Sequence, residues 1–258
     1  MLSAETPYVD LARRFGVGIG TIPREDEATL AAGNFRDSAT FAAIVSFKPD
    51  ILIVDQFWMT IDTFVRELPG KKVLLTLQMD LSIFHIRTPQ REFRFRSEDY
   101  DLLIRTEPGY ETPFDSIEIQ PMIIRNRDEI KSREAALAEL GLSGAAQACL
   151  FSCSGEENQI AAIWKSFSYL QDEGWEVVRS QHRSGGLFPA IDWYDAFQLI
   201  ICGAGYSAFW EARWMRKEAF FVPFKRRFED QARRPALFSD YEFDTNGADE
   251  LIKLIAGL

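Results

Sequence analysis

The chain has 258 residues, of which 47% are hydrophobic and 26% are charged, and its formal net charge at pH 7 is −10. That length is enough for one large or two modest domains with cores of their own. The acidic balance argues against a nucleic-acid partner, because phosphate backbones are bound mainly through an excess of lysine and arginine. We therefore expect no nucleic acid among the partners, and an anionic ligand must meet a local feature of the chain.

The cysteines and the N-terminal residues indicate a reducing compartment. Cys149, Cys153 and Cys202 lie in apolar or strand-like stretches, and with two histidines in the chain no metal-ligand spacing can be assembled. We expect reduced thiols that pack as small hydrophobic side chains. The first residues hold no apolar signal-peptide core, and no apolar run approaches the ~18 residues that a membrane helix needs. The sequence thus predicts a cytoplasmic protein, with at most a peripheral contact on the cytosolic face of a membrane.

Short apolar runs alternate with helical spacing through the first half. Runs rich in Ile, Leu and Val on both faces suit a parallel sheet that is covered by helices. We expect strands at 16–23, 50–57, 72–78 and 101–106, and helices at 25–47 and 59–68. This alternation is typical of an α/β domain.

A charged, alanine-rich helix is predicted at 126–142, where the sequence changes character. Asn126 and Glu129 have the spacing of a capping box, and Gly141 stands where a left-handed C-terminal residue is wanted. We therefore expect a first domain at 1–125, a linker helix at 126–144 and a second domain at 145–258.

The second half repeats the alternation of strands and helices. We expect strands at 148–155, 175–181, 198–205 and 219–224, helices at 158–174, 206–217 and 247–258, and a short turn or helix at 188–197. Two α/β domains joined by a linker usually bind their ligand in the cleft between them, at the carboxyl ends of the strands.

The stretch ICGAGYSAFWEA at 201–212 reads as a buried strand, a glycine turn and a helix. Gly203 and Gly205 let the backbone turn tightly and approach a ligand at the helix N-terminus, where free N–H groups favour a phosphate. The same glycines also suit a plain strand-to-helix turn. A dinucleotide-binding dehydrogenase would want an acidic residue about 20 positions later, after the next strand. That strand ends in Pro-Phe-Lys at 223–225, which disfavours a dehydrogenase.

A resemblance to a known family is carried by residues 194–234, whose sequence is YDAFQLIICGAGYSAFWEARWMRKEAFFVPFKRRFEDQARR. The segment resembles the donor-binding half of nucleotide-sugar glycosyltransferases of the GT-B type. It is similar to the family of the N-acetylglucosaminyltransferase that forms lipid II, glycosyltransferase family 28. The matching features are Gly205, Glu211, Val222, Pro223, Asp230 and Gln231. The resemblance implies two Rossmann-like domains with parallel sheets, the first of them abbreviated, and a hexosyltransferase activity.

The resemblance also implies a set of donor contacts in the second domain. Glu211 would accept the hydroxyls of the ribose, since it lies about one and a half turns into its helix. Taken alone, Glu211 reads as a surface charge, and the aromatic residues upstream of it read as core packing. The implied diphosphate contacts are Ser152, Ser154, Gly155, Gly203, Ala204, Gly205, Tyr206 and Ser207. The implied base contacts are Phe188, Ile191 and Tyr194, and the implied sugar contacts are Asp230 and Gln231.

One motif of the family does not occur in this sequence. Family members begin with a strand and a glycine-rich loop that ends in histidine and supports the catalytic base, whereas no Gly-Gly-x-Gly-His is present here. Another carboxylate or imidazole would then have to deprotonate the acceptor, a role that needs only suitable geometry and pKa. The candidates near the ends of predicted first-domain strands are Asp80, His85 and Asp55.

The functional prediction is an inverting, metal-independent glycosyltransferase that uses a UDP-sugar and an unknown hydroxyl acceptor, which a lipid could carry. We expect no cofactor and no metal, because a helix N-terminus and nearby cations can stabilise a departing nucleoside diphosphate. The alternatives are a nucleotide-sugar binding protein without catalysis, a subunit whose acceptor site is completed by a partner chain, and a nucleotide-sugar hydrolase.

Basic residues cluster in the same region of this acidic chain. They suit a diphosphate site or a contact with anionic lipid, and they also suit a solvated face that is interleaved with acidic residues. The cluster comprises Arg213, Arg216, Lys217, Lys225, Arg226, Arg227, Arg233 and Arg234.

Overall fold

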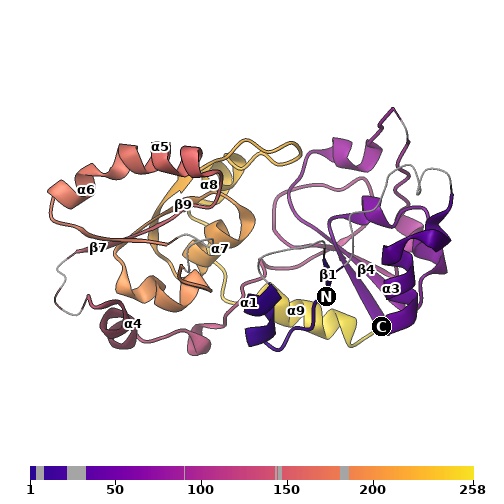
Figure 1. The fold of residues 1–258 in the computed structure, drawn as a ribbon, viewed down its shortest axis with the longest axis horizontal. Helices are drawn as coiled ribbons and strands as arrows, with labels where there is room; N and C mark the ends of the chain where they lie inside the picture. Colours follow the sequence, from indigo (N-terminus) through magenta and orange to yellow (C-terminus); the bar gives the residue numbers. More distant parts are fainter. Residues whose placement is uncertain (4–8, 22–32, 90, 143, 145–146, 181–185) are drawn as a thin grey trace.

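The computed structural model describes residues 1–3, 9–21, 33–89, 91–142, 144, 147–180 and 186–258. The described residues form two four-stranded parallel sheets, one in each half of the chain, which lie side by side along the long axis of the molecule (Figure 1). This arrangement confirms the α/β class with two parallel sheets.

The first sheet has the strand order β3-β4-β5-β6. Its strands are β3 (Ile51–Asp55), β4 (Lys71–Thr76), β5 (Leu102–Arg105) and β6 (Ile117–Glu118). The strands predicted at 50–57, 72–78 and 101–106 are therefore confirmed. Of the strand predicted at 16–23, Gly20–Thr21 form β2, which pairs with β1 (Leu2–Ser3) in a separate sheet; residues 16–19 are not strand, and residues 22–23 lie outside the described residues.

The first-half helices are shorter than the sequence predicts. The end of the helix predicted at 25–47 is α3 (Ala39–Phe47), whose N-cap Ser38 accepts a hydrogen bond from the Phe41 N–H; residues 25–32 lie outside the described residues. Upstream of it, α1 (Val9–Arg14) was not predicted.

The helix predicted at 59–68 is wrong, because the chain forms two 3-10 turns there, Trp58–Thr60 and Val65–Glu67. Its apolar side chains are buried, as a helical pattern also requires. However, a run rich in β-branched residues gains little from an α-helix, so the packing of Trp58 and Phe64 in the core decides the local backbone.

The connector between the halves is broken into two pieces. The capping box of Asn126 and Glu129 is confirmed, but the turn it begins is only a 3-10 turn, Arg127–Glu129. A separate helix follows, α4 (Arg133–Leu140), which Ser132 caps and which Gly141 ends in the predicted left-handed conformation.

The second sheet has the order β10-β9-β7-β8. Its strands are β7 (Ala148–Ser152), β8 (Glu176–Arg179), β9 (Leu199–Gly203) and β10 (Glu218–Val222). Its helices are α5 (Glu157–Phe167), α6 (Tyr169–Asp172), α7 (Tyr206–Trp214) and α8 (Arg233–Phe238), with a 3-10 segment at Ala190–Ala196. The register pairs Ser152 with Cys202 and Gly203 with Val222, so the turns after β7, β9 and β10 meet at one edge.

The last helix, α9 (Gly247–Ile255), packs on the first sheet although it lies within the range predicted for the second domain. Leu251 belongs to a core cluster with Val73, Leu75 and Ile104, and the chain ends beside the first half (Figure 1). Because α9 is amphipathic, the sheet that its apolar face covers is settled by packing and not by chain order. Among the described residues, no helix is long and apolar enough to cross a membrane.

Candidate functional site

The carboxyl ends of the two sheets face each other across the boundary between the halves. Glu107, which follows β5, is fully buried and accepts two hydrogen bonds from Arg234 of α8, from Nε at 2.8 Å and from Nη2 at 2.8 Å. The Gln78 N–H donates to the same carboxylate at 2.6 Å, and the Trp210 indole of α7 donates at 2.7 Å. Four donors thus satisfy one buried charge, and they join β4, β5, α7 and α8.

A second polar contact lies on the first turn of α7. The Tyr206 hydroxyl donates to the Thr106 carbonyl at 2.7 Å and accepts from the Met122 N–H at 2.7 Å. The sequence predicts this residue as a diphosphate contact. Its hydroxyl instead joins the two halves of the molecule, so only its backbone N–H stays open to that role.

The turn into α7 is lined by small residues, as predicted. Gly205 is the N-cap, and no hydrogen bond from a described side chain caps the helix. A Cβ atom on Gly155 would lie 3.5 Å from the Phe224 ring, and one on Gly203 would lie 3.2 Å from it, so this ring rests against both turns. Gln231 Nε2 would lie 3.7 Å from a Cβ on Gly205. The structure therefore gathers the turns after β7 and β9 with the loop after β10.

Glu211 lies one and a half turns into α7 in a poorly solvated position. The pKa of its carboxyl is raised to about 7, mainly because burial disfavours the charged form and also because of the nearby charge of Asp192, while a hydrogen bond with Tyr194 acts to lower it. Asp192 is itself nearly buried and forms an ion pair with Arg125, with 3.0 Å between Oδ1 and Nε. Two carboxylates therefore share a small region that holds one arginine, an arrangement that occurs often at functional sites.

The predicted base contacts differ in their exposure. Ile191 and Tyr194 are buried in the core of the second half, with 0% and 1% of their surface exposed. Phe188 keeps 36% of its surface exposed. The reading of these aromatic positions as core packing holds for Tyr194, because the residues around it close over its ring.

The predicted phosphate and sugar contacts surround the same turns. Ser152 is half-buried and Ser154 and Ser207 are exposed, whereas Ala204 is fully buried and its carbonyl accepts from Arg234 Nη1 at 3.3 Å. Asp230 is exposed, and its carboxylate accepts from the Ala232 N–H.

The amide of Gln231, the second predicted sugar contact, already has partners at both ends. Its oxygen accepts from the Phe224 N–H at 2.9 Å, and its nitrogen donates to Glu229 at 2.9 Å. A sugar hydroxyl would have to share one of these groups or displace it.

The three predicted base candidates lie on the first half. Asp55 ends β3 and is exposed, although partial desolvation raises the pKa of its carboxyl. Asp80 caps a 3-10 turn, Leu81–His85, and its hydrogen bonds from Ser82 lower the pKa of its carboxyl. The Asp80 N–H also donates to the Phe228 carbonyl at 2.7 Å, which places this residue against the loop after β10. His85 is exposed at the end of the same turn.

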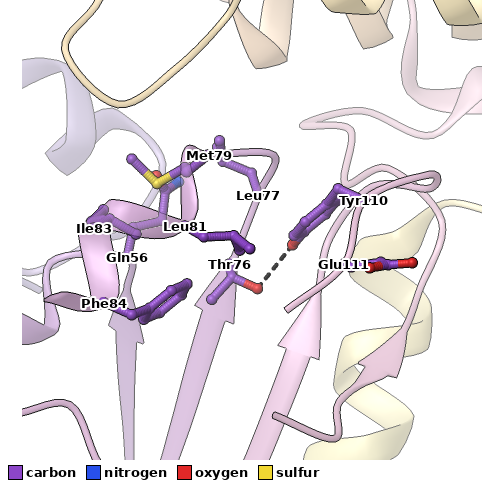
Figure 2. A pocket seen from close by; sticks show the side chains of 9 residues that line it. All are labelled: Gln56, Thr76, Leu77, Met79, Leu81, Ile83, Phe84, Tyr110 and Glu111. Carbon is purple, nitrogen blue, oxygen red and sulfur yellow. Dashed lines mark hydrogen bonds between the residues drawn. The ribbon is translucent and has the colours of Figure 1, made fainter. Parts of the chain in front are cut away.

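A small pocket lies at the carboxyl edge of the first sheet, with a volume of about 10 Å³, room for about one water molecule. Its wall includes Thr76 at the end of β4, whose hydroxyl lies 2.8 Å from the Tyr110 hydroxyl (Figure 2). Glu111 also lines it and is exposed. The sequence did not single out Glu107 or Glu111, and it indicated Arg234 only as a member of the basic cluster. The one sequence signal for Glu107 is its place directly after a predicted strand, in the Thr-Glu pair at 106–107. Nothing in the sequence pairs it with an arginine 127 positions away.

Cys149, Cys153 and Cys202 are free thiols and buried, and burial raises the pKa of Cys149 and Cys153 to about 12. Within the described ranges, no group of three or more His, Cys, Asp or Glu side chains is placed to hold a metal ion. Asp99 and Asp101, which flank Tyr100, pair with Arg66 and Lys71 near the amino edge of the first sheet.

Neither a family model nor a curated protein matches the sequence, but solved structures match the fold. "Spinosyn Forosaminyltransferase SpnP" is 14% identical, covers 93% of this chain and 75% of its own, and has a TM-score of 0.59. SsfS6, a glycosyltransferase of Streptomyces sp. SF2575, is 12% identical, covers 87% and 73%, and has a TM-score of 0.54. The chain has the GT-B fold. Acinetobacter baumannii MurG also matches, at 11% identity and a TM-score of 0.45, too low a score to choose a branch of GT-B proteins.

Proposed function

We propose that this GT-B chain binds a nucleotide-diphosphate sugar in its second half and transfers the sugar to a hydroxyl acceptor held by its first half. The observation that carries the proposal is α7, which begins among glycine-lined turns with no cap from a described side chain and holds the half-buried, desolvated carboxyl of Glu211. A helix N-terminus of this kind attracts a phosphate, and a carboxylate nearby can accept the hydroxyls of a ribose.

Charges near the turns support a departing diphosphate. In the loop after β10, the backbones of Lys225 and Asp230 pair in an isolated antiparallel β-bridge. The loop exposes three consecutive basic residues at 225–227. The Arg226 guanidinium lies 5.5 Å from the Phe224 ring centroid, and this ring rests on Gly155 and Gly203. Cations in this position and the dipole of α7 stabilise negative charge as it develops on the leaving group.

The acceptor hydroxyl needs a base on the first half, across the boundary from α7. Among the three candidates, Asp80 lies against the loop that carries Asp230 and Gln231, the proposed sugar contacts. Its carboxylate is ionised at neutral pH and can accept a proton, although the hydrogen bonds from Ser82, which lower its pKa, make it a weaker base. Asp55 and His85 stay alternatives for the same role.

The finer parts of the proposal concern the ligands and the place of action. UDP is the proposed nucleotide, the reaction inverts the configuration of the sugar, and no metal takes part. The protein acts in the cytoplasm and touches a membrane at most peripherally. These proposals rest on the resemblance, the acidic net charge and the Glu211 site, and each of them can be tested by a binding or activity assay.

The test is calorimetric titration of the purified chain with UDP, GDP, TDP and their common sugar conjugates. Saturable binding is expected, and Glu211→Ala is expected to weaken it about tenfold or more, since a hydrogen bond to a charged group contributes about 1.5–3 kcal/mol. Glu173→Ala, which changes an exposed glutamate at the end of α6, is the matched control and should bind normally. Absence of binding to every nucleotide would contradict the proposal.

An assay of nucleotide release then separates the catalytic alternatives. Release only with an added acceptor supports a transferase, release into water alone supports a hydrolase, and binding without release supports a silent binding subunit or one that needs a partner chain. EDTA is expected to leave binding and release unchanged. A loss that only Mg²⁺ or Mn²⁺ restores would contradict the metal-independent proposal.

A further inference from the structure

The first half of the chain carries a hollow of about 580 Å³, a volume typical of small-molecule sites. Four arginines line it, Arg66 from the connection between β3 and β4, and Arg91, Arg94 and Arg96 from the connection between β4 and β5. The residues that line this arginine hollow include none of the proposed donor contacts and none of the three base candidates. The hollow is therefore a separate feature of the molecule.

The hydrophobic core holds the segment that carries Arg94 and Arg96. Phe93 and Phe95 pack against the core of the first half, where the Phe95 ring centroid lies 5.2 Å from that of Trp58. Side chains of an extended segment alternate between its two faces, and exposure alternates in the same way from 92 to 96. Because the phenylalanines face the core, Arg94 and Arg96 lie on the opposite face and line the hollow.

A buried ion pair fixes the same segment from a second direction. The side chains of Asp62 and Arg91 are 3% and 4% exposed, and they bond directly to each other. The other carboxylate oxygen of Asp62 accepts a hydrogen bond from the Arg94 N–H at 3.1 Å. The backbone that carries the exposed arginines is thus positioned before any ligand arrives, which lowers the entropy that binding has to offset.

The acidic residues of the arginine hollow are paired with other cations. The four pairs are Asp62 with Arg91, Glu67 with Arg36, Glu92 with Arg87 and Asp99 with Arg66. Among the described residues, the guanidinium groups of Arg94 and Arg96 have neither a hydrogen bond nor an ion pair. The chain has 39 acidic and 29 basic residues, so carboxylates are plentiful. Two neighbouring guanidiniums without one leave a local surplus of positive charge that suits an anion from outside the chain.

We propose that the arginine hollow binds a phosphorylated small molecule, whose phosphate group Arg94 and Arg96 hold between them. Two positions along an extended segment span roughly 6.5 Å, so both guanidiniums can reach the oxygens of one phosphate or diphosphate group. A phosphate carries nearly two charges at pH 7 and has three accepting oxygens, which matches two guanidinium forks better than a single carboxylate does. This inference does not rest on the proposed function, because the hollow shares no residue with the donor site.

The experiment measures pyrophosphate binding while the donor site is occupied. The full chain is saturated with the nucleotide that binds best, and inorganic pyrophosphate is then titrated by calorimetry. The wild type is expected to bind one pyrophosphate, and more weakly as the salt concentration rises. Arg94→Met or Arg96→Met should weaken this binding about tenfold, because charge-assisted hydrogen bonds are lost. The two substitutions together should abolish it.

Two further double variants make the result specific. Arg14→Met with Lys165→Met removes the same amount of positive charge from exposed positions on α1 and α5, and should bind pyrophosphate as wild type does. Arg94→Lys with Arg96→Lys keeps the charge but not the guanidinium forks, and should bind with intermediate affinity. Since Arg94 and Arg96 are exposed, these variants are expected to fold normally.

The outcomes separate this inference from the proposed function. A nucleotide-saturated wild type that binds no pyrophosphate, or equal weakening by the control pair, would overturn the phosphate site. Nucleotide affinity should be normal in Arg94→Met with Arg96→Met, and its loss would contradict the separation of the two sites. If the wild type binds no nucleotide, the proposed function fails, and the same variants titrated directly with pyrophosphate still test the arginine hollow.

Discussion

Two glutamates in this molecule, the fully buried Glu107 and the half-buried Glu211, have opposite surroundings. Glu107, at the boundary between the halves, meets Arg234 in a two-point ion pair and also accepts hydrogen bonds from Gln78 and Trp210. Glu211, on the same helix as Trp210, lies near a second carboxylate and has a raised pKa. The first carboxylate is fully compensated within the protein, whereas the second is held at a cost in stability.

This difference in compensation indicates different roles for the two carboxylates. A buried charge that its own protein satisfies serves to fix an arrangement, here the placement of α7 and α8 against the first sheet. A buried carboxylate that its protein leaves poorly compensated has hydrogen-bonding capacity for a ligand. The comparison therefore predicts that changes near Glu107 alter stability, and that changes at Glu211 alter binding and its pH dependence.

Removal of the partner of Glu107 should give the largest effect. Arg234→Met leaves a buried carboxylate without its cation, which is expected to lower the free energy of unfolding by about 3–5 kcal/mol. Urea unfolding measures the loss. The control is Arg233→Met, which changes an exposed neighbour and should cost far less. In the double variant Glu107→Gln with Arg234→Met, part of the stability should return; a double variant no more stable than Arg234→Met would contradict the pairing.

Ionisation of Glu211 should give a pH-dependent effect of the next size. The folded-state pKa is raised to about 7 from the ordinary 4.5, so its stabilising contribution is complete below the ordinary pKa and is lost as the pH rises through about 7. Between pH 5 and pH 8 the wild type should lose up to about 3 kcal/mol of stability relative to Glu211→Gln. Urea unfolding of both proteins across this range checks the sign. Parallel stability curves for the two proteins would show that Glu211 is not desolvated in solution.

Loss of the Tyr206 hydroxyl should give the smallest effect. Tyr206→Phe leaves the Met122 N–H without its acceptor and removes a hydrogen bond to the Thr106 carbonyl, which is expected to cost about 1–2 kcal/mol. The affinity for a nucleotide should not change, because the hydroxyl is used between the halves. Tyr169→Phe, on the surface of α6, serves as the control for both measurements. A large loss of nucleotide affinity with normal stability would return Tyr206 to the donor site.

Local rules predicted much of the fold. The Ile-, Leu- and Val-rich runs of β4, β7 and β9 are strands, and the cap residues Asn126 and Gly141 stand where the sequence placed them. The predictions failed where the packing of apolar side chains in the core overrode the apolar spacing of the sequence. Residues 59–68 have apolar spacing that suits a helix, yet two 3-10 turns bury the same side chains. The spacing alone does not distinguish these solutions, because both place apolar groups on one side.

The candidate site shows the same division. The turn at Gly203 and Gly205, its helix and the position of Glu211 on that helix follow from contiguous sequence, and a resemblance in one segment was enough to find them. The surroundings of Glu211 come from elements far apart in the chain, since Asp192 and Tyr194 lie on a preceding segment and Arg125 on the connector. The raised pKa, and the use of the Tyr206 hydroxyl between the halves, depend on those distant neighbours.

The sequence by itself determined the class of fold and the glycine turn with its helix, because propensity and spacing act locally along the chain. Only the tertiary structure decided which sheet α9 covers and which charges are paired across the two halves. These features depend on burial and on distances between residues that chain order does not constrain, and the energy of a charge or a ring is set by those neighbours.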